Sequence, residues 1–132
     1  MEKGKKLTLE ALLAKKEQRE AERFAVRRVE VPSLGGTLDL ERIPLTRIAA
    51  MMDGIGGDSM VDSLAFDAEL IYACCPMMRN RELQAAYECA EPTDIVFRLL
   101  GDNMGEVNLM VSEILKMYGL DSGADLKTLV KN

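Results

Sequence analysis

The stretch at residues 58–100, DSMVDSLAFDAELIYACCPMMRNRELQAAYECAEPTDIVFRLL, decides the fold class. Pro76 and Pro92 divide it into three segments, and each segment carries apolar residues at three- and four-residue steps. Such steps place side chains on one face of a helix. Proline ends a helix because it lacks the N–H group and disfavours a helical residue before it. The stretch therefore predicts three consecutive helices, and none of them could bury its apolar face alone.

Local signals predict where these helices begin and end. Short polar side chains accept hydrogen bonds from the free amides of a first turn. We therefore expect Asp58 or Ser59 to cap the first helix, Asn80 the second and Thr93 the third, with Gly101 closing the last. The apolar face expected on the first helix consists of Val61, Leu64, Ala65, Ala68, Ile71, Tyr72 and Cys75.

The flanking sequence predicts one hairpin and further helices. Residues 7–26 have the pattern of a mostly charged helix, and Gly35-Gly36 separates two alternating runs at 29–31 and 38–40, which is typical of a β-hairpin. Pro44 can open a short helix. Asp102 or Asn103 can cap a last long helix, whose apolar stripe is Val107, Met110, Val111, Ile114, Leu115 and Tyr118. The expected fold is mainly α, a small multi-helix domain with an N-terminal helical arm and one β-hairpin.

Charge divides the chain into parts. Residues 1–28 hold nine basic and five acidic side chains, a net charge of +4, whereas the 132-residue chain as a whole has −5. We therefore expect a basic arm at 1–28, a single acidic domain at 29–120 with its hairpin at 29–42, and a short tail at 121–132. The acidic domain should repel nucleic acid. The basic arm can fold onto the acidic domain of its own or another copy.

Composition argues against catalysis, metals and membranes. There is no histidine, which is the commonest general base near neutral pH and the commonest metal ligand. Cys74, Cys75 and Cys89 match no zinc spacing, so we expect three reduced thiols. No phosphate-loop motif, signal peptide or membrane-spanning apolar run is evident. With 48% apolar residues the chain can form a core, and the sequence favours a binding protein without catalytic residues, cofactor or metal.

Eight apolar side chains are the least explained by a core, and we predict that they contact a partner. Four lie on the arm and four lie near turns, where flexible methionines can adapt to a partner. Met77 and Met78 follow Pro76, where side chains tend to be exposed. The predicted partner-binding residues are Leu9, Leu12, Leu13, Phe24, Met51, Met52, Met77 and Met78.

Several short strings occur together in an order that resembles one family. In the central stretch they are ELIY (69–72), CP (75–76), NRELQ (80–84), Tyr87 and EPTDIV (91–96). Outside it they are LLAKKEQR (12–19), VPSLG (31–35) and the closing 115–119. This order resembles the XkdN-like tail assembly chaperones of tailed phages and prophages, over roughly residues 7–120.

The resemblance implies a function that the residues alone do not. It implies a chaperone that coats the tape measure protein during tail morphogenesis and leaves before the virion is complete. The resemblance implies that the tape measure protein is the partner, with the tail tube protein as a further candidate, and that the protein acts in the cytoplasm of the bacterial host. Self-association is expected separately, because the basic arm can fold onto the acidic domain of another copy. Two alternatives stay open: a structural tail or baseplate subunit, and a small acidic regulatory interaction protein.

Overall fold

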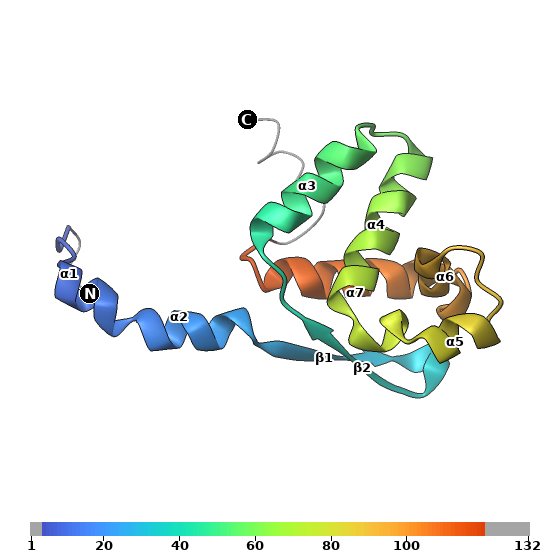
Figure 1. Ribbon diagram of the computed structural model, residues 1–132, viewed down its shortest axis with the longest axis horizontal. Helices are drawn as coiled ribbons and strands as arrows, with labels where there is room; N and C mark the ends of the chain where they lie inside the picture. Colours follow the sequence, from blue (N-terminus) through green and yellow to red (C-terminus); the bar gives the residue numbers. More distant parts are fainter. Residues whose placement is uncertain (1–3, 121–132) are drawn as a thin grey trace.

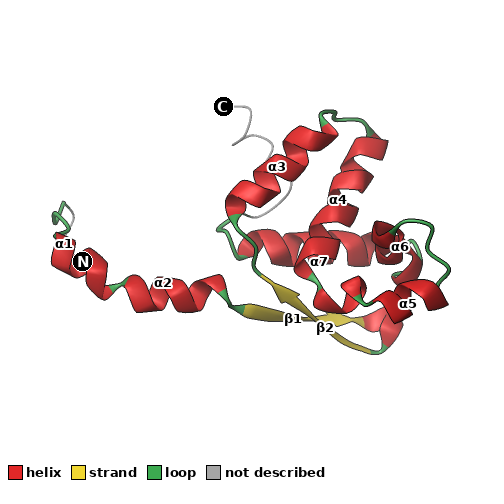
Figure 2. Ribbon diagram, in the orientation of Figure 1, coloured by secondary structure: helices red, strands yellow, loops and turns green. Residues whose placement is uncertain are grey.

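A computed structural model describes residues 4–120 of the protein, so the tail predicted at 121–132 lies outside the described residues. The described chain is mainly helical with one antiparallel hairpin, which confirms the expected fold class (Figures 1 and 2). Its elements are α1 (Leu9–Ala14), α2 (Lys16–Arg23), β1 (Val26–Val31), the 3₁₀ turn η1 (Pro32–Leu34), β2 (Gly36–Glu41), α3 (Leu45–Ile55), α4 (Met60–Cys74), η2 (Pro76–Arg79), α5 (Arg81–Ala86), η3 (Pro92–Asp94), α6 (Ile95–Leu99) and α7 (Met104–Lys116).

Helix α4 is the central element, because α3, α6, α7, η2 and β2 all contact it. Its start is fixed by a capping box in which Ser59 Oγ accepts from the Asp62 amide at 3.2 Å, as the sequence predicted for Ser59. The helix ends before Pro76, also as predicted. The predicted apolar face is only partly correct. The C-terminal half of α4 is buried on several sides, whereas Val61 and Ala65 near its start are exposed.

The segment after α4 differs from the prediction at two points. Asn80 caps α5 as expected, since its side chain accepts from the Leu83 amide at 3.0 Å. However, α5 ends at Ala86, well before Pro92, and Glu88 then takes a left-handed φ of 55°. Pro92 instead opens η3, and Asp94 rather than Thr93 makes the capping contact, accepting from the Glu91 amide at 2.9 Å. Proline fits this first position because its fixed φ suits a helical turn.

The hairpin lies with one face on the helices. Val29 pairs with Leu38 in an antiparallel register, and Gly35 takes a φ of 67° that few other residues adopt at a turn. Val29, Val31 and Leu40 are buried, because β1 packs against α7 while β2 packs against η2 and α4. Packing on the helical layer stabilises a hairpin that would be marginal on its own.

Helix α7 packs against α4 and β1 and contributes a row of buried apolar side chains to the core. Asn103 caps it by accepting from the Glu106 amide at 3.1 Å. The buried carboxylate of Glu106 accepts from the Ser33 amide at 2.9 Å and so joins the start of α7 to the hairpin turn. The predicted stripe is confirmed as core at Val107, Met110, Val111, Ile114 and Leu115, which are all buried, while Tyr118 is half-buried.

The N-terminal segment forms two short helices rather than the one helix predicted over 7–26. Thr8 caps α1, but α1 and α2 are separated at Lys15, and the chain is already in β1 at Val26. Neither helix contains a buried residue. Both point away from the rest of the described chain (Figure 1). We refer to residues 7–24 as the arm and to the elements from β1 to α7 as the body.

Candidate partner-binding surface

The structure places the eight predicted partner-binding residues in three environments. On the arm, Leu9, Leu12, Leu13 and Phe24 are 72%, 53%, 61% and 76% exposed. On the body, Met77 is 56% exposed, whereas Met51 and Met52 are half-buried and pack against the core. Met78 is fully buried. The residues therefore do not form one surface, and most of the exposed side chains among these eight lie on the arm.

The expectation that Met78 is exposed is wrong. The residues after Pro76 do not form an open loop but a 3₁₀ turn, η2, which packs against β2 and α4. The turn points Met78 into the core and leaves its neighbour Met77 outside. The Gln84 side chain donates to the Met78 carbonyl at 2.8 Å, which holds the turn against α5. Of this pair, only Met77 remains available to a partner.

The leucines of α1 form the densest uncovered apolar patch. Leu7 precedes them and is itself 64% exposed, so four leucines lie open within seven residues. Lysines at 5, 6, 15 and 16 flank this patch, and Glu10 is the one acid between them. Contiguous apolar surface of this kind usually marks a contact site. An acidic, amphipathic partner would match both the apolar patch and its basic rim.

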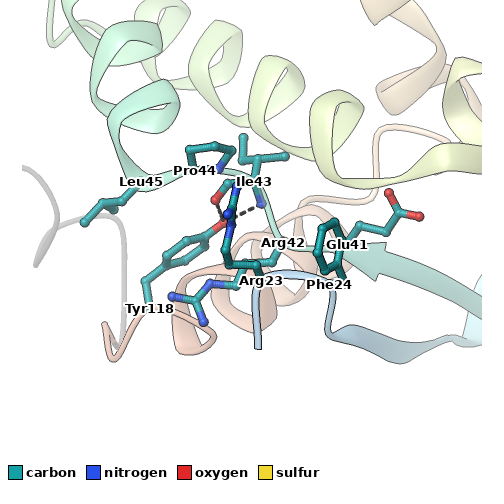
Figure 3. A pocket seen from close by; sticks show the side chains of 8 residues that line it. All are labelled: Arg23, Phe24, Glu41, Arg42, Ile43, Pro44, Leu45 and Tyr118. Atoms are coloured by element: carbon teal, nitrogen blue, oxygen red, sulfur yellow. Dashed lines mark hydrogen bonds between the residues drawn. The ribbon is translucent and has the colours of Figure 1, made fainter. Parts of the chain in front are cut away.

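A hollow of about 370 Å³ lies where the arm joins the body (Figure 3). Arg23 and Phe24 line it from the end of the arm, and Arg42, Ile43 and Leu45 line it from the chain between β2 and α3. Tyr118 forms another wall, and its hydroxyl accepts from the Ile43 amide at 2.8 Å and donates to the Ile43 carbonyl. The Arg42 guanidinium lies 4.9 Å from the centre of the Tyr118 ring. These contacts hold the Tyr118 ring in place as one wall of the hollow.

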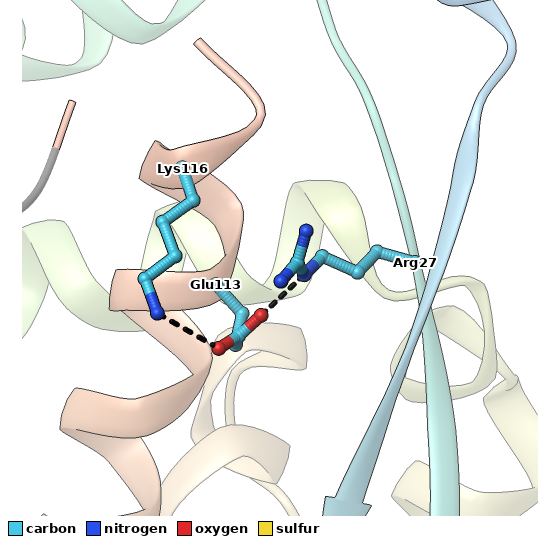
Figure 4. Close-up of polar contacts among 3 residues, drawn as sticks. All are labelled: Arg27, Glu113 and Lys116. Carbon is cyan, nitrogen blue, oxygen red and sulfur yellow. Dashed lines mark hydrogen bonds and ion pairs between the residues drawn. The ribbon is translucent and has the colours of Figure 1, made fainter. Parts of the chain in front are cut away.

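An ion-pair cluster holds β1 beside α7, immediately after the arm (Figure 4). Glu113 on α7 accepts from Arg27 on β1 and, at 3.3 Å, from Lys116 on its own helix. Burial raises the pKa of Glu113, but the hydrogen bonds and charges of Arg27 and Lys116 outweigh it, so the pKa lies below its usual value of 4.5. The cluster therefore fixes the first residues of the body from which the arm extends.

Glu113 should make stability depend on pH in the acid range. Its pKa is lower in the folded chain than in the unfolded chain, so its contribution is complete above about pH 5 and is lost as pH falls through the folded pKa. Replacing Glu113 by Gln should cost about 0.5–1 kcal/mol at pH 7 and progressively less towards pH 3. Urea unfolding at pH 7, 5 and 3 measures this. Glu10→Gln on the exposed arm is the matched control, and a constant difference across pH would contradict the expected linkage.

A second uncovered apolar surface was not predicted from the sequence. Met60 and Val61 at the start of α4 are 73% and 76% exposed, and Ala65 lies exposed one turn further. Residues 51–69 contain five acidic and no basic side chains. We call the surface of Met60, Val61 and Ala65, with the neighbouring acids Asp58 and Glu69, the α4 face. Its apolar spacing matches that of a core helix, so the sequence pattern alone gives no signal for exposure.

The described residues show no arrangement suited to catalysis at the cysteines. Cys74 and Cys75 are buried, and burial raises the pKa of Cys74 to about 12, so its thiol stays protonated at neutral pH. Cys89 is half-buried. Within residues 4–120 no group of three or more His, Cys, Asp or Glu side chains could hold a metal ion. No helix in that part of the chain is both long and apolar enough to cross a membrane.

Comparison with known proteins gives a match to one family model. A family model described as phage XkdN-like tail assembly chaperone protein matches residues 9–128. The matched range includes the arm leucines, the hairpin and the α4 face. No curated protein and no solved structure matches the chain.

Proposed function

The chain belongs to the phage XkdN-like tail assembly chaperone family, and from that premise we propose that it binds the tape measure protein during tail morphogenesis. The family match confirms the resemblance drawn from the short strings above. The observation that supports a binding role most directly is the uncovered leucine patch of α1. A tail assembly chaperone needs apolar surface that is free for a client, and the arm presents such surface without a covering element in the described chain.

The proposed mechanism is temporary cover of apolar client helices. Leu9, Leu12 and Leu13 would lie along the apolar face of a client helix, in the manner of amphipathic helices that pack by their stripes. Phe24 and Met77 would widen the contact towards the body. The apolar contact needs no nucleotide, cofactor or catalytic residue, and a modest affinity allows the growing tail tube to displace the chaperone. The proposal includes a place in the cytoplasm of the bacterial host and the tail tube protein as a second partner.

Removing the α1 patch should abolish client protection. We expect the triple variant Leu9→Ser, Leu12→Ser, Leu13→Ser to bind a helical tape measure fragment of the same phage at least about tenfold more weakly, because three apolar anchors are lost. Light scattering of the aggregating fragment, with isothermal titration calorimetry for affinity, measures this. The melting temperature should hardly change, because none of the three side chains is buried.

The matched control removes exposed apolar side chains elsewhere. Leu34 and Leu109 are 41% and 40% exposed on the body, and the variant Leu34→Ser, Leu109→Ser should protect the fragment like the wild type. Equal protection by the arm variant would contradict the proposal. Mass spectrometry of finished particles separates the alternatives, because a structural tail or baseplate subunit persists in them at fixed stoichiometry and a chaperone does not.

A further inference from the structure

We propose that the arm of one copy docks on the α4 face of a second copy, so that the leucines of α1 cover Met60, Val61 and Ala65. This interaction is between copies of the chain and does not depend on the proposed client. Both surfaces are uncovered in the single chain. They lie on separate elements. The leucine patch is flanked by lysines, whereas the α4 face carries acidic side chains.

The arm needs a partner on physical grounds. Its helices have six and eight residues and no extensive contact with the body in the described chain. Isolated helices shorter than about 12–15 residues are marginal in water, so helices of this length depend on packing against another surface. The leucines are the side chains that such packing would bury.

The α4 face complements the arm in apolar character and charge. Val61, Ala65 and Glu69 follow one another at four-residue steps, so they lie along one line of the helix. Small and β-branched side chains leave room for leucines to approach closely. Residues 51–69 contain acidic but no basic side chains, while the leucine patch of the arm has a lysine rim. Complementary charge of this kind favours the correct pairing and speeds association.

The geometry of the chain favours a second copy over its own body. Only Phe24 and Ala25 separate α2 from β1, and the Arg27–Glu113 pair holds β1 against α7. The arm runs away from the body, whereas α4 begins at the far end of α3, on the opposite side (Figure 1). Two copies that exchange arms would form a closed pair, and exchange along a row would form a chain of copies.

Disulfide trapping tests directly whether the arm of a second copy lies on the α4 face. In a Cys89→Ser background, which keeps Cys74 and Cys75 buried, one preparation carries Leu12→Cys and another carries Val61→Cys. Mixing the two preparations under mild oxidation should give a cross-linked dimer. A mixture of the Leu12→Cys preparation with a Leu34→Cys preparation should give none. A chain carrying both Leu12→Cys and Val61→Cys that closes within one monomer at high dilution would overturn the proposal, as would the absence of the mixed dimer.

Charge exchange tests the chemistry of the contact. Lys15→Glu with Lys16→Glu on the arm, or Asp58→Lys with Glu69→Lys on the α4 face, should each weaken self-association at least about tenfold, because like charges then meet. Combining all four substitutions should restore association to within about threefold of the wild type. The matched control, Glu30→Lys with Glu88→Lys, reverses exposed acids elsewhere and should leave association unchanged. Sedimentation velocity over a concentration series at low salt measures this without any client.

The outcomes for the two proposals are separable. Arm docking would be overturned if the wild type is monomeric, or if neither charge reversal changes its self-association. Neither result bears on protection of a tape measure fragment, which is measured by light scattering. Salt screens charge pairs, so the wild type and the four-substitution variant should both dissociate at high salt. That result would support the docking proposal.

Discussion

Truncating Met78 to alanine should lower the free energy of unfolding by about 2–4 kcal/mol, whereas the same change at the adjacent Met77 should alter it by less than about 0.5 kcal/mol. Met78 is fully buried within the core formed by η2, β2 and α4, so its removal leaves a cavity. Met77 is 56% exposed, so water replaces it. The two side chains are chemically identical and adjacent in sequence, and each serves as the control for the other.

Urea unfolding followed by circular dichroism measures both changes. Equal and small effects would return Met78 to the surface, as the sequence pattern had indicated. Equal and large effects would place Met77 in the core and remove it from the proposed client contact. With the expected asymmetry, Met77→Ala should reduce client binding only slightly, because the exposed leucines of α1 supply most of the proposed client contact.

The local signals of the sequence predicted the helix starts well, because capping depends on a few neighbouring residues. Ser59, Asn80 and Asn103 each cap the helix predicted for them. The end of α5 could not be predicted in the same way. Glu88 takes a left-handed conformation without being glycine or asparagine, so its sequence carries none of the usual signals for a helix end.

Burial around α4 could be predicted only in part, because helical periodicity marks one face and not the number of covering elements. The C-terminal half of the helix is enclosed by several neighbours, so Leu70 and Cys74 are buried outside the predicted face. The N-terminal half extends beyond these neighbours, so Val61 is exposed within it. The arm leucines were predictable because they belong to no long apolar stripe. The α4 face was not, since its apolar spacing equals that of a core.

The client contact and the contact with a second copy both use the leucines of α1, so they compete. A client helix and a second copy cannot both cover Leu9, Leu12 and Leu13 at the same time. Self-association would then shelter the client-binding patch until a client displaces the second copy. Because the two contacts compete for the same leucines, the balance between them depends on their affinities and on the concentrations of client and chaperone.

Replacing Tyr118 by phenylalanine should destabilise the fold by about 1–3 kcal/mol, although it removes a single oxygen atom. The hydroxyl bonds both the N–H and the C=O of Ile43, a buried residue at the junction of β2 and α3. Phenylalanine keeps the ring under Arg42 but leaves both backbone groups without that partner. Tyr87→Phe is the matched control, because within residues 4–120 the Tyr87 hydroxyl has no hydrogen bond and its loss should cost little.

Urea unfolding and amide hydrogen exchange measure the effect of Tyr118→Phe together. The Ile43 amide should exchange markedly faster in this variant, since its acceptor is gone, while amides in α4 should follow only the global loss of stability. Unchanged stability with unchanged Ile43 protection would mean that water or the chain itself replaces the hydroxyl. The same junction forms a wall of the hollow at the base of the arm, so Tyr118 connects the end of α7 to the region from which the proposed contacts extend.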